Sequence, residues 1–192
     1  MEKLAGSLEK PLPRPRRDLV GYAAARTLEA LLEAIIALEY LERGYTRNAA
    51  GKAFQAWRAL TGALLALELD RVKERLGSEE EKRWLEERAV ARIPTSRLKP
   101  LSQLLEETGY PNYSFYTSTA LALHDYQYNG PDPAAEITPY PTRESAAKDI
   151  LLLLRVLTEL IETRVKPRLA ETGAWKKEHE EALNMLRKRL WR

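Results

Sequence analysis

The chain has 192 residues, no cysteine, two histidines and a formal net charge of +3. The lack of cysteine excludes disulfides, thiol catalysis and cysteine metal sites, and the small net charge does not by itself indicate nucleic-acid binding. Because no run of about eighteen apolar residues and no signal-like stretch is present, we expect a cytoplasmic protein without a membrane span.

Amino-acid usage resembles that of heat-adapted proteins. Arginine, glutamate and leucine are abundant, whereas asparagine and glutamine together number seven. Few thermolabile amides beside many ion-pair formers are typical of thermophiles. We therefore expect a thermophilic source.

Residues 1–17 are predicted to form an extended arm rich in proline and arginine. Pro11, Pro13 and Pro15 alternate with other residues, and alternate prolines exclude a helix. The arginines among them could lie along a phosphate backbone. The alternative is an arm that packs along the protein itself or along a partner subunit, since three arginines carry little specificity.

Residues 18–76 are predicted to form a helical hairpin around which the rest of the chain packs. Asp18 suits the first N-cap, and Gly44 suits the stop between the two helices. Apolar residues recur at intervals of three and four, which places them on one face of each helix. They are Ala24, Leu28, Leu31, Ile35 and Leu38 in residues 18–43, and Ala49, Ala53, Trp57, Leu60, Leu64 and Leu67 in residues 47–76.

The second helix of this hairpin has a polar side opposite its apolar face. Two glycines lie on the polar side, and each costs about 1 kcal/mol relative to alanine in a helix interior. That cost suggests that a ligand, a loop or another helix packs closely there. The polar side consists of Asn48, Gly51, Lys52, Gln55, Arg58 and Gly62.

Shorter helices are predicted for residues 77–109, with a start at Ser78 followed by three glutamates and a break at Pro94. Residues 110–141 are the most aromatic part of the chain. They contain a short helix and then a proline-rich loop over 129–141. A long irregular loop in a compact domain is often functional, although it can also simply wrap a bundle.

A third long helix is predicted for residues 142–172, with a broad apolar face and with Pro167 ending or bending it. Residues 173–192 are predicted to form a final amphipathic helix. Together these patterns predict an all-α fold, an antiparallel up-and-down bundle of four to five main helices with short accessory helices. The expected organisation is an arm at 1–17, a bundle at 18–172 and the C-terminal helix.

His124 and Asp125 are the candidates for acid–base catalysis, because they lie among four tyrosines just before the proline-rich loop. The alternative is a histidine that donates to a backbone carbonyl while the tyrosines close the end of the bundle. His179 lies in a cluster of glutamates and is predicted to be on a solvated helix face. No metal site and no cofactor are predicted.

Two segments resemble a known family. Residues 49–60, Ala-Ala-Gly-Lys-Ala-Phe-Gln-Ala-Trp-Arg-Ala-Leu, are similar to the alanine-rich second helix of HEPN-like proteins, and more narrowly of their archaeal Pyrobaculum-repeat branch. Residues 120–129, which include His124, are similar to the Leu-His-x-x-aromatic-Tyr segment of that branch. The order of elements agrees over roughly residues 20–165.

The resemblance implies an antiparallel bundle of four or five helices, often a homodimer, in a superfamily whose members bind nucleotides or cleave RNA. The nuclease members carry an arginine and then a histidine, with four to six residues between them. Here Thr117, Ser118 and Thr119 precede His124, and the corresponding positions before His179 also lack arginine. A HEPN ribonuclease would therefore be a degenerate one.

We predict a ligand surface at the end of the bundle near the proline-rich loop. Three functions are kept open: an interaction or assembly module that forms a homodimer, a nucleotide- or RNA-binding protein, and a hydrolase. The partner would be a second copy, a nucleotide, RNA or another protein, with no membrane, and whether the protein is an enzyme is left open. The predicted surface consists of Lys52, Gln55, Arg58 and Tyr116 as ligand contacts, with His124 and Asp125 as catalytic candidates.

Overall fold

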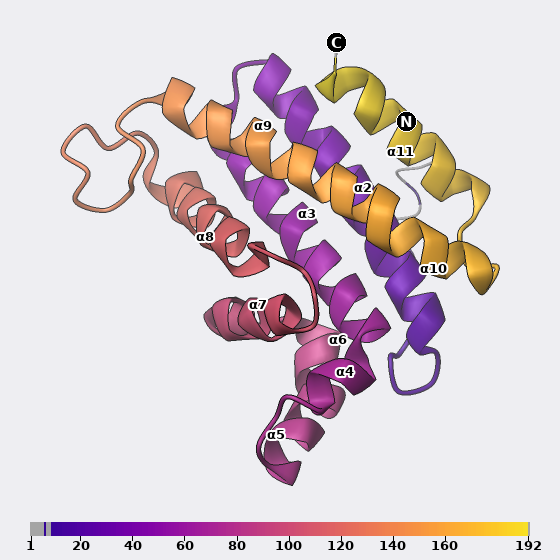
Figure 1. The fold of residues 1–192 in the computed structure, drawn as a ribbon. Coiled ribbons are helices and arrows are strands. Elements are labelled where there is room, and N and C mark those ends of the chain that lie inside the picture. Colours follow the sequence, from indigo (N-terminus) through magenta and orange to yellow (C-terminus); the bar gives the residue numbers. More distant parts are fainter. Residues whose placement is uncertain (1–5, 7–8, 192) are drawn as a thin grey trace.

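The computed structural model describes residues 6 and 9–191 (Figure 1). Residues 1–5 and 7–8 of the predicted arm, and residue 192 of the predicted C-terminal helix, lie outside the described residues. The predicted all-α fold is confirmed, since the described residues form helices and no strand. The main helices are α2 (Leu19–Glu42), α3 (Thr46–Leu67), α7 (Leu98–Glu107), α8 (Tyr113–Asn129), α9 (Arg143–Leu160) and α11 (Lys177–Leu190). Shorter elements are α4 (Leu69–Lys73), α5 (Glu79–Trp84), α6 (Val90–Arg92) and α10 (Lys166–Glu171), a 3₁₀ turn at Thr95–Arg97, and π turns at Leu85–Ala89 and Ile161–Val165.

Helices α2 and α3 form the hairpin at the centre of the molecule. The Asp18 side chain accepts a hydrogen bond from the backbone N–H of Gly21 at 2.7 Å, as expected for an N-cap. Gly44 ends the turn with φ +80°, a backbone conformation that suits glycine. Alanines on both helices are fully buried, and small side chains let the two helices approach closely.

The other main helices cover the hairpin on several sides. Helix α9 crosses over one face of it, α8 lies beside α3, and α11 lies beside α2 (Figure 1). Their apolar faces meet in one core, in which Trp57, Leu123 and Leu154 are completely buried. Within the described part of the chain, no helix has both the length and the apolar character needed to cross a membrane.

The second helix of the hairpin is shorter than predicted. It ends at Leu67, and the chain bends at Glu68 before α4 begins. In a continuous helix the Leu67 carbonyl would accept from the N–H four residues ahead, but here it accepts from the side chain of Arg168. The prediction of one helix over residues 47–76 was therefore wrong, because a distant arginine binds the backbone at the bend.

The third long helix also has an interruption. A capping box formed by Thr142 and Ser145 precedes α9, and the chain continues through the π turn at Ile161–Val165 into α10. Pro167 lies at the start of α10. Because proline lacks the N–H of a normal helical turn, a wider turn just before it lets the helical path continue.

The described part of the arm packs along the protein, which is the second of the two alternatives raised by its sequence. Residues 10–13 border a cleft of about 430 Å³, whose other walls come from α2 and from the start of α11. Arg16 forms an ion pair with Glu87.

The loop between α8 and α9 projects from the body of the molecule (Figure 1). Its own polar groups hold it in shape, because the Asp132 carboxylate accepts from the N–H groups of Ile137 and Thr138 at 2.6 and 3.0 Å. The buried Tyr140 donates its hydroxyl to Asp149 at 2.9 Å. The proline-rich segment is therefore an anchored loop.

Candidate functional site

A cleft of about 460 Å³ opens where the end of α2, the start of α3 and the end of α8 meet. The turn around Gly44 brings the first two of these segments together, and the packing of α8 against α3 adds the third. The cleft is lined by Tyr40, Arg47, Asn48, Gly51, Lys52, Gln55 and Gln127.

Arg47 connects two of the helices that line this cleft. Its guanidinium donates to the carbonyl oxygens of Gln127 and Tyr128, at 2.9 and 2.5 Å, near the C-terminal end of α8. The last carbonyls of a helix have no partner within the helix and carry partial negative charge, so an arginine is favourable there. This contact joins the start of α3 to the end of α8.

The two glycines of α3 make room for side chains of neighbouring helices. A Cβ atom at Gly51 would lie 2.6 Å from Cδ and Oε1 of Gln127, so only glycine allows Gln127 to rest on the backbone of α3. A Cβ atom at Gly62 would lie 3.0 Å from Nε of Arg26 and 3.3 Å from the hydroxyl of Tyr22. The close packing expected at both positions is thus provided by α8 and α2.

Lys52 and Gln55, two of the predicted ligand contacts, both line the cleft. The Lys52 ammonium is 2.9 Å from a carboxylate oxygen of Glu33 on α2, which holds it at the border of the cleft. Arg58, one turn further along α3, faces a different set of groups. Its pKa is lowered by burial and by the nearby Arg26, and the carboxylate of Glu29 partly offsets this.

His124 lies between aromatic rings. It stacks on Phe54 of α3 with ring centroids 4.2 Å apart, and it meets Tyr128 edge-on at 5.2 Å. Its Nδ1 is buried, and the described residues provide no hydrogen-bond partner for it. Asp125 is exposed to solvent, since neighbouring helical residues point about 100° apart.

Tyr116, the remaining predicted contact, is half-buried against Trp57 with ring centroids 6.2 Å apart. The contacts of five of the six predicted residues therefore divide into three groups, whereas Asp125 is exposed. Lys52 and Gln55 share the cleft, His124 and Tyr116 belong to aromatic contacts between α3 and α8, and Arg58 faces α2.

His179 is buried, so the prediction of a solvated position was wrong. Its Nδ1 accepts from the backbone N–H of Lys176 at 3.2 Å, and its Nε2 donates to the carbonyl of Ala24 at 2.9 Å. These contacts occupy both nitrogens of a neutral imidazole and fasten the start of α11 to α2. Burial lowers the pKa of His179 below its ordinary value, in agreement with the neutral form.

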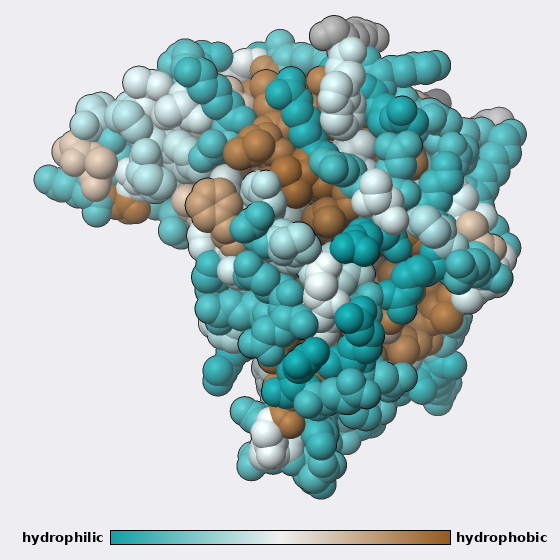
Figure 2. Space-filling model, in the orientation of Figure 1, coloured by the Kyte–Doolittle hydropathy of each residue, from teal (hydrophilic) through white to brown (hydrophobic). Residues whose placement is uncertain are grey.

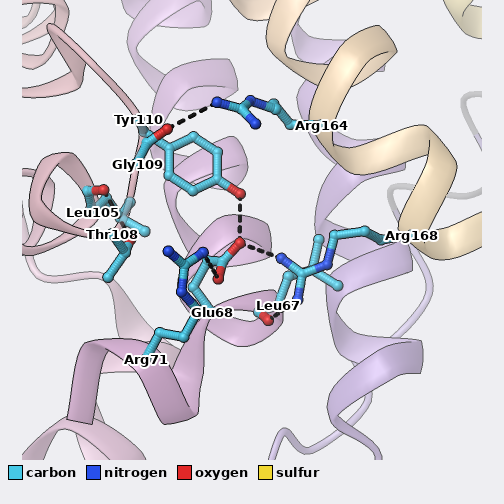
Figure 3. Close-up of polar contacts among 9 residues, drawn as sticks. All are labelled: Leu67, Glu68, Arg71, Leu105, Thr108, Gly109, Tyr110, Arg164 and Arg168. Atoms are coloured by element: carbon cyan, nitrogen blue, oxygen red, sulfur yellow. Dashed lines mark hydrogen bonds and ion pairs between the residues drawn. The ribbon is translucent and has the colours of Figure 1, made fainter. Parts of the chain in front are cut away.

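A second polar cluster surrounds Glu68 at the opposite end of α3 (Figure 3). Its carboxylate, 4% exposed, accepts from the hydroxyl of Tyr110 at 2.8 Å, from Arg71 at 3.1 Å and from Arg168. Burial, and then the hydrogen bond to Glu68, raises the pKa of Tyr110 above its ordinary value, so the hydroxyl remains a donor. Glu68 thereby links α3, the loop before α8, and α10.

Sequence reasoning missed this cluster, because Glu68 lies 100 positions from Arg168 and the two share no motif. The break in the apolar periodicity of α3 at Glu68 was the available signal. Among the described residues, no group of three or more acidic or histidine side chains could hold a metal ion.

The fold and the cleft define an all-α protein built on an alanine-rich hairpin, with a polar cleft at the turn end of that hairpin and a buried carboxylate cluster at the other. The model of the archaeal PaREP1/PaREP8 family matches residues 25–151. The chain belongs to this family, and the matched residues include the whole cleft. Searches of curated proteins and of solved structures gave no match.

Proposed function

We propose that this protein is a HEPN-like helical protein that binds a nucleotide, or the nucleotide units of an RNA, in the cleft between α2, α3 and α8. The charge of the cleft lining carries the proposal. Two cations and three amide side chains border the cleft, and no carboxylate does. Three other clefts on the described surface are each bordered by two glutamates.

The side chains of the cleft match the parts of a nucleotide. Arg47 and Lys52 supply positive charge for a phosphate group. Asn48, Gln55 and Gln127 carry both donors and acceptors, which suit the edge of a base. Tyr40 offers an aromatic face for stacking.

The test is the thermal stability of the protein in the presence of nucleoside mono-, di- and triphosphates. A nucleotide at 100 times its Kd stabilises the folded state by about 2.7 kcal/mol, which raises the Tm. We expect this rise for the native protein and its loss in Lys52→Gln. Lys148→Gln is the matched control, because Lys148 is exposed on α9 and does not line the cleft. A Tm that does not respond to any nucleotide, or an equal response in Lys52→Gln, would contradict the proposal.

A second candidate function is that of a homodimeric interaction module. Figure 2 shows apolar atoms gathered over the middle of α9, where Leu152 is 41% exposed and Leu151 and Val156 are partly buried. Apolar surface of this kind commonly marks an interface, and two-fold dimers are the commonest assembly. We expect light scattering at micromolar concentration to give twice the 22.0 kDa chain mass, and Leu152→Glu to give the chain mass. A native protein that scatters as a single chain would exclude this candidate.

A further inference from the structure

Three arginines converge on the loop between α7 and α8 (Figure 3). Arg164 donates to the carbonyl oxygen of Gly109 at 2.9 Å, and its guanidinium lies over the ring of Tyr110, 5.6 Å from the centroid. Arg71 approaches the same glycine from α4, and Arg168 lies beside them on Glu68. Arg71 is far in the sequence from Arg164 and Arg168, which lie on consecutive turns.

The charges of this group do not cancel. The carboxylate of Glu68 forms ion pairs with two of the three arginines, Arg71 and Arg168. The guanidinium of Arg168 is already hydrogen-bonded within the protein, because it donates to Glu68 and also to the carbonyl of Leu67. Arg164 donates to a neutral carbonyl, so its charge is retained. The group therefore has an excess of positive charge.

The donors that remain are accessible at the surface. An arginine carries five N–H donors. The side chain of Arg71 is 58% exposed and makes one bond to Glu68, and Arg164 is also exposed. Both arginines therefore retain N–H donors that can bind a ligand.

The space between these two arginines is open. Gly109 is exposed and has φ +107°, a conformation in which a larger residue would be strained. Among the described residues, a Cβ atom at this position would have one neighbour within 4 Å, Nη2 of Arg71 at 3.9 Å. The bare backbone therefore leaves room for a ligand atom group at Gly109, beside Arg71 and next to the carbonyl that binds Arg164.

We propose that the surface over Gly109 binds a phosphate group, with Arg71 and Arg164 contacting it from two sides. Arginine is suited to phosphate because its planar donors can bind two oxygens at once. The site is separate from the proposed nucleotide cleft, since Lys52 lies near the start of α3 and Glu68 directly follows its end, sixteen residues later. That spacing corresponds to about 24 Å along a helix. Free phosphate and a nucleic-acid backbone offer the same chemistry.

The first test uses a fluorescein-labelled oligouridine of about 12 nucleotides, within the range of strand lengths that single-strand sites cover. Its fluorescence anisotropy is measured at a series of salt concentrations. Each phosphate contact contributes about 0.7 to the slope of log affinity against log salt. Because both arginines contact one phosphate, we expect the slope of Arg71→Gln/Arg164→Gln to be smaller by about 0.7.

Two matched variants separate this site from general charge and from folding. Arg71→Lys/Arg164→Lys keeps the charge and is expected to keep most of the slope. Arg88→Gln/Arg155→Gln removes two exposed arginines elsewhere and is expected to change the slope less. The Tm of each variant shows that it is folded. Lys52→Gln tests the cleft separately, so failure of the nucleotide proposal leaves this result unaffected.

Inorganic phosphate distinguishes the two sources of the ligand. If the oligouridine does not bind but phosphate raises the Tm of the native protein and not of Arg71→Gln/Arg164→Gln, the site is one for free phosphate. If the oligouridine binds with the expected slopes, the ligand is a nucleic-acid backbone. The proposal is overturned if the double glutamine variant behaves like the native protein towards both probes.

Discussion

Replacing Arg168 with methionine is expected to lower the free energy of unfolding by about 3 kcal/mol. The substitution keeps the unbranched apolar part of the side chain but leaves the carboxylate of Glu68, 4% exposed, without its ion-pair partner on α10. It also leaves the carbonyl of Leu67 without the donor that holds the bend between α3 and α4. Denaturation by urea, followed by circular dichroism, measures the change.

The double variant Glu68→Gln/Arg168→Met isolates the charge. A neutral amide in place of the buried carboxylate removes a charge that only the exposed Arg71 would still pair with, so we expect the double variant to be more stable than Arg168→Met alone. Arg155→Met on the exposed side of α9 is the control, with an expected change within about 0.5 kcal/mol. A double variant that is less stable than the single one would show that the charge of Glu68 is not the cause.

Replacing Trp57 with alanine is expected to cost about 3–5 kcal/mol. The indole is completely buried, stacks on Tyr113 with ring centroids 4.7 Å apart, and donates from Nε1 to the hydroxyl of Thr117 at 2.9 Å. Alanine would leave a cavity between α3 and α8. The loss of stability is measured by the same urea denaturation.

Trp57→Phe separates the ring contacts from the hydrogen bond. Phenylalanine retains a ring against Tyr113 but cannot donate to Thr117, whose hydroxyl still donates to the carbonyl of Tyr113 at 3.0 Å. We therefore expect a smaller loss, about 1–2 kcal/mol. An equally large loss in both variants would mean that the indole N–H, and not its burial, is what stabilises the contact of α3 with α8.

The parts of the fold that were predicted correctly rest on local chemistry. The period of the apolar residues identified α2 and the first two thirds of the next predicted helix. The helix start predicted at Ser78 is the start of α5, where Ser78 and Glu81 form a capping box. The errors arise where distant residues meet. Arg168 is far from Leu67 in the sequence, and no local pattern shows that it binds there.

The candidate site shows the same division. The spacing of Lys52 and Gln55 placed them on one side of a helix, and both border the cleft. Tyr40, Arg47 and Gln127 complete the cleft, but they come from different helices, so the sequence offered no reason to group them. His179 was misjudged because its neighbours are charged, whereas its burial depends on the docking of α11 against α2.

Gly51 and Gly62 also bear on how the hairpin finds its alignment. Faces lined by alanine are nearly smooth, so two such helices could slide past each other by a turn at little cost. The two glycines, which have no Cβ atom, leave gaps in this surface. One receives the amide of Gln127 and the other the guanidinium of Arg26, and these side chains can enter only where a Cβ is missing. The glycines thereby set the register of α3 against both α8 and α2, which the uniform alanine pattern does not determine.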